Sequence, residues 1–120
     1  MPRPLLTPRE VLQALRRKVY AVDLATGEVT RRGRAVTPFV KPSGRRLVRV
    51  YYGGKVKAML LARLVWMAGA NRTIPKGFEV HHHDEENDND AFRNLFCLHK
   101  LDHRKRHAAV AVVADDEVPF

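Results

Sequence analysis

Acidic residues are scarce in the first 78 residues of this 120-residue sequence. This part contains seventeen Lys and Arg but only three acids, Glu10, Asp23 and Glu28, which leaves a net charge of +14. The whole chain carries +9, and its pI is about 10.3. Such an excess is typical of proteins that bind polyanions, because each phosphate that a cation neutralises releases counterions. We expect nucleic acid as the partner; the alternative is a chain that its Lys and Arg merely keep soluble.

The sequence also has a single cysteine and no long apolar run. Cys97 excludes an internal disulfide and fits a reducing compartment, and its apolar neighbours indicate a small core residue rather than a catalytic thiol. The apolar runs are far shorter than the roughly 20 residues of a membrane span. The segment MPRPLLTPRE has no secretory signal pattern. We expect a cytoplasmic protein of a bacterial host cell, whether the gene is the cell's own or a phage's.

The first half predicts one helix and two β-hairpins. Thr7, Pro8 and Glu10 form a helix-start pattern, and leucines at helical spacing follow, so we expect a helix over 8–18. VYAVDLATGEVTRRG predicts two short strands around a turn, and RRLVRVYY and KVKAMLL predict a hairpin around Gly-Gly. Between the hairpins, 31–46 is rich in Arg, Gly and Pro and predicts a basic loop near the ligand.

The second half predicts a helix and then a strand, loop, strand and helix. LLARLVWMAGA carries good helix formers over 60–70, and Leu61, Leu64, Val65 and Met67 should pack on the sheet. Trp66 is expected in the core or at its boundary rather than stacked on a base. The later elements are expected at 77–81, 83–93, 95–98 and 101–110. The fold class is α+β.

Histidines at particular spacings indicate a metal site. His103 and His107 are four apart on the last predicted helix and share one face. With His81 from the preceding strand they can offer three nitrogens to a divalent ion and leave one position open. Neighbours on a strand point to opposite faces, so His82 is expected to stay unligated and face water as a proton acceptor. Asn94 can serve either the metal or the loop.

A bland interpretation exists for each of these features. A histidine triplet can be a solvated loop, and an i, i+4 histidine pair can be incidental. In a chain of charge +9 both together favour a site.

The stretch LARLVWMAGANRTIPKGFEVHHHDEENDNDAFRNLFCLHKLDHRKRH resembles the HNH endonuclease family, particularly its small phage and intron-type members. The resemblance covers about residues 60 to 107 and runs through RLVW, the IP-x-G turn, HH, the Asp two positions on, NL and a later His. It implies a ββα-metal core over 60–110, between a basic helix and hairpin region at 1–59 and an acidic tail at 111–120, in one compact unit.

The resemblance also implies roles for single residues. His82 matches the general base, His81 the metal ligand before it, and Asn94 an asparagine that binds metal or stabilises the site. His103 matches the final histidine of the motif, and with His107 it is similar to the helix histidines of bacterial colicin nucleases. The implied reaction is hydrolysis of DNA phosphodiester bonds with one divalent cation, Mg²⁺, Mn²⁺ or Zn²⁺. The alternative is a non-catalytic nucleic-acid-binding protein, a packaging or repair accessory with a structural metal; an RNA target also stays open.

Two further expectations concern partners. Cations are expected to hold the phosphate backbone around the site, namely Arg45, Arg46, Arg63, Arg93, Arg104 and Lys105. The terminal DDEVPF resembles the C-terminal tip of bacterial single-stranded-DNA-binding proteins, which suggests docking on host proteins that bind such tips. The alternative is a frayed end.

Overall fold

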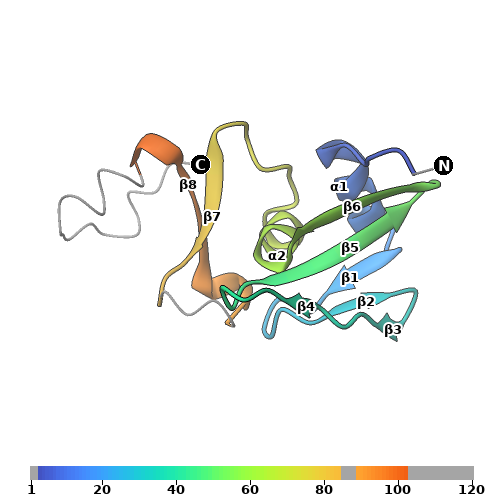
Figure 1. Ribbon diagram of the computed structural model, residues 1–120, viewed down its shortest axis with the longest axis horizontal. Helices are drawn as coiled ribbons and strands as arrows, with labels where there is room; N and C mark the ends of the chain where they lie inside the picture. The colour runs from blue at the N-terminus through green and yellow to red at the C-terminus, as the bar shows by residue number, and fades with distance from the viewer. Residues whose placement is uncertain (1–2, 85–88, 103–120) are drawn as a thin grey trace.

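The computed structural model describes residues 3–84 and 89–102. Helix α2 (Leu61–Ala70) runs through the middle of the described part, with long strands of a sheet on one side and a two-stranded ribbon on the other (Figure 1). Helix α1 (Pro8–Arg16) packs against α2 and the sheet. The α+β fold class expected from the sequence is confirmed.

Helix α1 begins at the predicted cap. Thr7 Oγ1 accepts the Glu10 N–H at 3.2 Å, and Glu10 Oε1 accepts the Thr7 N–H at 2.9 Å, which closes a capping box. The helix ends at Arg16, before the predicted end at 18, because Lys18 takes a left-handed conformation with φ 61°. The buried residues of its apolar face are Val11, Leu12, Ala14 and Leu15.

Six strands form two antiparallel sheets. The first sheet holds β1 (Tyr20–Val22), β2 (Val29–Arg31) and β3 (Arg34–Ala35) in that order. The second holds β4 (Phe39–Val40), β5 (Arg46–Tyr52) and β6 (Lys55–Leu60). The predicted Gly-Gly turn joins β5 to β6, and positive φ angles at Gly53 (57°) and Gly54 (77°) give the turn its hairpin geometry.

The segment 31–46 was predicted as a loop, and this is wrong in part, because it contributes strands β3 and β4. β3 folds back on β2 through Arg32 (φ 50°) and Gly33 (φ 83°). β4 pairs with the start of β5, with Phe39 opposite Leu47. Strands of two residues are too short to show the alternation by which a strand is predicted.

Helix α2 supplies the centre of the core. Trp66 is 4% exposed, so its predicted place in the core is confirmed. Asn71 closes the helix in a left-handed conformation (φ 55°), and Arg16 donates to its Oδ1 at 2.9 Å and its backbone O at 3.0 Å. These bonds tie α1 to the end of α2. The four side chains that were predicted to pack are all buried: Leu61, Leu64, Val65 and Met67.

The ribbon consists of β7 (Phe78–His82) and β8 (Leu95–His99), and a 3₁₀ turn, η1 (Phe92–Asn94), leads into β8. Val80 lies opposite Cys97, and His82 lies opposite Leu95. Cys97 is fully buried, and this burial raises the pKa of its thiol, so the prediction of a core residue is confirmed.

Residues 100 to 102 are helical where the described part ends, and the rest of the helix predicted at 101–110 lies outside the described residues. The tail predicted to dock on host proteins lies outside them too. In the described ranges no helix has the length and apolar character needed to cross a membrane.

Candidate active site

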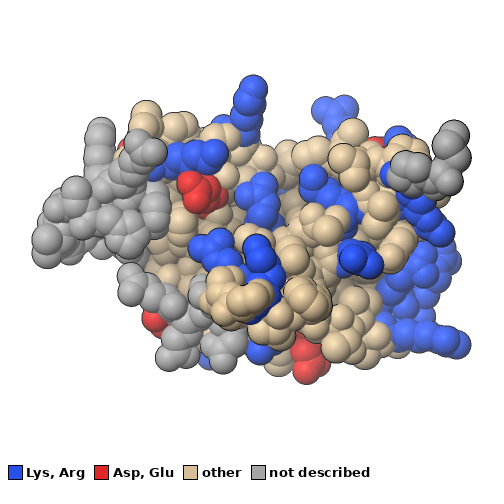
Figure 2. Space-filling view, in the orientation of Figure 1, with Lys and Arg blue, Asp and Glu red and all other residues tan. Residues whose placement is uncertain are grey.

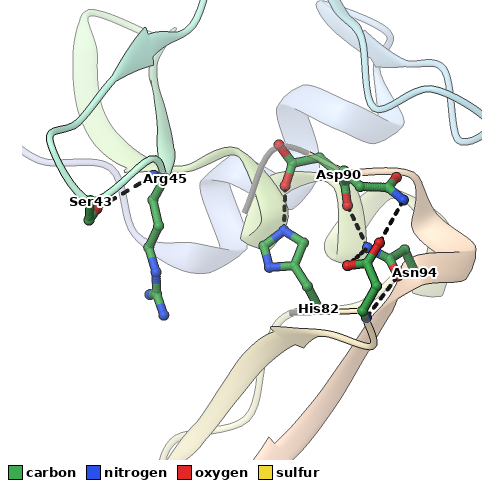
Figure 3. A network of polar contacts seen from close by, with 7 residues as sticks. Ser43, Arg45, His82, Asp90 and Asn94 are labelled. Carbon is green, nitrogen blue, oxygen red and sulfur yellow. Dashed lines mark hydrogen bonds and ion pairs between the residues drawn. The ribbon is translucent and has the colours of Figure 1, made fainter. Parts of the chain in front are cut away.

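His82 is the last residue of β7, and Asp90 holds its imidazole. His82 Nε2 lies 2.7 Å from Asp90 Oδ1 (Figure 3). The two side chains are 9% and 3% exposed. An ionised carboxylate only accepts hydrogen bonds, so Nε2 carries the hydrogen and Nδ1 keeps a free lone pair. The sequence led us to expect that the His82 ring faces water. The structure instead buries the ring against the carboxylate of Asp90.

The turn between β1 and β2 supports the segment that carries Asp90. Phe92 N donates to Leu24 O at 2.8 Å. Gly27, at φ +81°, lies so close that a Cβ there would stand 2.7 Å from the backbone O of Asp90. Glycine permits both the positive φ and this approach. The position of Asp90 thus depends on the N-terminal hairpin as well as on its own loop.

The burial of the second carboxylate oxygen of Asp90 is energetically unfavourable. Asp90 Oδ2 is buried, and among the described residues it has no hydrogen-bond partner. A buried acceptor without a partner lowers stability, and more so when it is charged. Its place beside His82 makes Asp90 a candidate for a part in the chemistry of the imidazole.

Asn94 joins the two ends of the loop between β7 and β8. Its Nδ2 donates to Asp84 Oδ1 at 3.0 Å and to Asn89 O at 2.8 Å, and its Oδ1 accepts the Asp84 N–H at 3.3 Å (Figure 3). His83 N donates to the backbone O of Asn94 at 2.7 Å. The sequence left two roles open for Asn94, and these contacts belong to the loop-shaping one.

His81 lies on the face of β7 opposite to that of His82, and His83, directly after the strand, stacks on Phe96 as His81 packs against it. The centroids of their rings are 5.6 Å and 4.6 Å from that of Phe96. Glu79 shares this face by strand alternation, and its Oε2 lies 3.9 Å from His81 Nε2. The separation of His81 from His82 that alternation predicted is present.

Only some of the predicted metal ligands lie in the described part of the chain. In residues 3–84 and 89–102 no three His, Cys, Asp or Glu side chains are grouped so that they could hold a metal ion. The predicted ligands His103 and His107 lie outside the described residues. His81 is described, and Glu79 adds a carboxylate beside it. An imidazole nitrogen and a carboxylate oxygen are donors that suit divalent ions such as Zn²⁺ or Mn²⁺.

Two of the predicted DNA contacts lie where the chain enters β5. Arg45 is exposed and Arg46 half-buried. In Figure 3 Arg45 lies across from His82, and the Nδ1 side of the imidazole is turned toward it. Of the predicted DNA contacts, Arg45 is therefore drawn on the side of the molecule where His82 stands.

The other predicted DNA contacts either lie apart from one another or fall outside the described residues. Arg93 is exposed on η1, directly before Asn94. Arg63 instead lines a hollow with Phe78, at the opposite end of β7 from His82. The structure therefore does not bring Arg63 to His82. The remaining two residues, Arg104 and Lys105, lie outside the described part.

Asp90 and Glu79 were not predicted from the sequence as candidate site residues. Asp90 stands in the run DEENDND, where nothing in the spacing distinguishes one acid from another. Its one distinctive feature is that it directly precedes Ala91 and Phe92, which lead back into the ribbon. An acid that adjoins apolar residues at a strand entry is a candidate for a buried partner.

No family model matches the sequence, and neither does any curated protein. Among solved structures, the chain is similar to the HNH homing endonuclease I-HmuI in a structure of DNA binding and cleavage, with 22% sequence identity and a TM-score of 0.59. The match covers 81% of this chain and 56% of the other, so this chain spans little more than half the length of that endonuclease.

At this identity the similarity concerns the fold. The chain has an HNH-like fold, and the resemblance predicted from the sequence is confirmed at that level.

Proposed function

We propose that the chain is a metal-dependent endonuclease that hydrolyses DNA phosphodiester bonds, with His82 as the general base. The observation that carries the proposal is the buried pair of His82 and Asp90 at the end of the ribbon. The HNH-like fold supports it, since the similar structure is that of a protein that binds and cleaves DNA.

The pair sets the direction of the proton transfer. Because Nε2 donates to Asp90, Nδ1 is the nitrogen that accepts a proton from the attacking water. The carboxylate keeps the ring in one orientation and stabilises the imidazolium that forms. Burial keeps bulk water from competing for the same hydrogen bonds. A positioned base of this kind contributes on the order of 10²–10⁴ in rate.

The metal in this proposal would be held by His81 and Glu79 from β7 together with His103 and His107. The described donors fit a divalent ion, because they combine a nitrogen and a carboxylate on one face of the strand. A divalent cation would supply positive charge for the phosphate and its leaving oxygen. Because His81 and Glu79 face away from His82 across β7, a phosphate served by both the metal and the base would lie past the end of the strand, where His82 is the last residue. Asn94 would shape the loop between the two strands, because its amide is already bonded to Asp84 and Asn89.

A plasmid-nicking assay tests the proposal. Wild-type protein with Mg²⁺, Mn²⁺ or Zn²⁺ should convert supercoiled plasmid to the nicked or linear form, and EDTA should stop the conversion. His82→Ala should lower the rate by about 10² or more while DNA binding is kept. Arg17→Ala, a change at an exposed residue directly after α1, serves as the matched control and should cleave normally.

The competing function is a non-catalytic DNA-binding protein in which the same metal is structural. It is favoured by an outcome in which the protein binds DNA tightly, gains thermal stability with metal, and cleaves nothing with any of the three ions. Cleavage by His82→Ala at the wild-type rate would also refute the base assignment.

A further inference from the structure

Two large apolar side chains on strand β4 are exposed to solvent. Phe39 is 67% exposed and Val40 is 59% exposed. β4 is an edge strand of its sheet. Exposed apolar side chains on an edge strand tend to associate with another molecule, so this pair marks a surface that a partner covers. Adjacent residues of a strand point to opposite faces, so the two side chains do not share one neighbour.

The surroundings of β4 are cationic. Between Glu28 and Glu79 the sequence has no acidic residue. Arg34 precedes β4, Lys41 and Arg45 follow it, and all three are exposed. Within the described ranges none of the three takes part in an ion pair. Blue side chains accordingly dominate the charged surface in Figure 2. A partner that satisfies this charge and also covers an aromatic ring combines phosphates with flat apolar faces, as a nucleic acid does.

The turn after β4 presents these cations on a fixed backbone. Lys41 N donates to Arg45 O at 2.8 Å, and Gly44 N donates to Lys41 O at 2.8 Å. Ser43 Oγ accepts the Arg45 N–H at 3.4 Å (Figure 3). Figure 3 draws Arg45 across from His82, so a ligand of the turn would lie on the same side of the molecule as the imidazole.

We infer that β4 and the turn after it bind DNA that has a locally unpaired base, with Phe39 stacked on that base and Lys41 and Arg45 on the flanking phosphates. The inference rests on the proposed function only for the identity of the nucleic acid. An aromatic ring reads the face of a base rather than its edge, so it selects an unstacked base and not a sequence. The substrate class is thus DNA with a bulge, a gap or a single-stranded stretch near the cleaved bond.

Fluorescence anisotropy on His82→Ala protein without divalent metal tests the inference, because cleavage then does not interfere. Three labelled DNAs are compared: an intact duplex, the same duplex with a one-base bulge, and the single strand. We expect the bulged and single-stranded DNAs to bind more tightly than the duplex. Phe39→Ala should remove this preference and weaken bulge binding roughly 5- to 150-fold, the range for one stacked base. Phe39→Trp should restore it.

Two readouts separate stacking from charge and from damage to the fold. Phe39→Ala should leave the slope of log K against log salt unchanged, whereas Lys41→Gln should reduce it by about 1. Leu5 provides a matched control, because it is 73% exposed and bridges to Val56 on β6, at the other edge of the same sheet. Leu5→Ala should bind all three DNAs like its parent, and Phe39→Ala should keep its melting temperature.

Equal affinity of Phe39→Ala and its parent for the bulged DNA would overturn the inference. So would self-association that disappears in Phe39→Ala while DNA binding is unchanged, because β4 would then pair copies of this chain. The proposed function fails separately: a wild-type protein that shows the Phe39-dependent preference but never nicks DNA would refute the nuclease and leave this inference standing.

Discussion

Asp90 places one carboxylate oxygen on His82 Nε2, while its other oxygen, buried as well, has no partner among the described residues. Asp90→Asn removes the charge and keeps the shape. We expect the nicking rate to fall by about 10² or more, because the neutral amide no longer stabilises the imidazolium. DNA affinity should not change, and the melting temperature should stay or rise, because the costly buried charge is gone.

The readouts for this change are single-turnover nicking, anisotropy and thermal unfolding. Glu28→Gln removes an exposed acid from the β1–β2 hairpin and should affect none of them. A fall in stability together with activity in Asp90→Asn would mean that the carboxylate acts on the fold instead of on the imidazole.

The orientation and burial of single residues could be predicted from the sequence where periodicity or apolar neighbours determine them. Strand alternation separated His81 from His82, and the apolar context placed Cys97 in the core. The partner of His82 was not readable. Asp90 reaches the imidazole through the path of a loop and through the turn at Gly27, and neither follows from a spacing.

The β1–β2 turn contacts the segment that carries Asp90. Gly27→Ala would place a Cβ 2.7 Å from Asp90 O, in a backbone conformation of φ +81° that side chains disfavour. We expect a loss of stability of about 1–3 kcal/mol from the strained backbone and, in addition, a loss of nicking activity as the Asp90 segment shifts.

The structure offers a close control for this prediction. Gly33 has almost the same backbone conformation, φ +83°, but a Cβ there would meet nothing within 4 Å. Gly33→Ala should therefore carry the cost of the backbone and keep the nicking rate. Equal effects of the two changes on activity would show that the contact with Asp90 is unimportant.

The start of α1 makes a prediction about pH. The hydrogen bond from Lys55 Nζ at 2.8 Å, followed by that from the Thr7 N–H, lowers the pKa of Glu10 from 4.5 to about 2. A carboxyl whose pKa is depressed on folding stabilises the protein at pH values above its unfolded pKa. That contribution is lost as the pH falls from about 4.5 toward 2.

Urea unfolding measured at a series of pH values between 6 and 3 checks this dependence. The stability of Glu10→Gln should fall less steeply with acidification than that of the wild type. Lys55→Met, which removes the main cause of the shift, should give an intermediate slope. Parallel curves for all three proteins would contradict a role for Glu10.

Elements with a strong local signal were predictable, and short ones were not. The capping box at Thr7 and the Gly-Gly turn at 53–54 act through neighbouring residues, so the sequence alone reveals them. Strands β3 and β4 owe their existence to pairing with β2 and β5, and two residues carry no pattern of their own.

For the whole molecule, the charge distribution is the property that the sequence predicts best. The count of Lys and Arg requires no fold, and the cations spread over the face in Figure 2. What the count could not predict is which cations stand near the site. Arg45 does, while Arg63 lies at the far end of β7.

This difference gives a prediction for DNA binding as a function of salt. If the chain holds the backbone through several cations, log K should fall linearly with log salt, by about 0.9 for each phosphate contact. Arg45→Gln should reduce the slope by about 1, because Arg45 is exposed and lies across from His82 in Figure 3. Arg63→Gln should leave the slope unchanged, because Arg63 lines the hollow beside Phe78 instead. Both variants lose the same net charge, so a general field effect would alter the two slopes equally. A smaller slope in Arg45→Gln alone would therefore mean that the DNA lies along the β4–β5 turn, with its phosphates next to the imidazole.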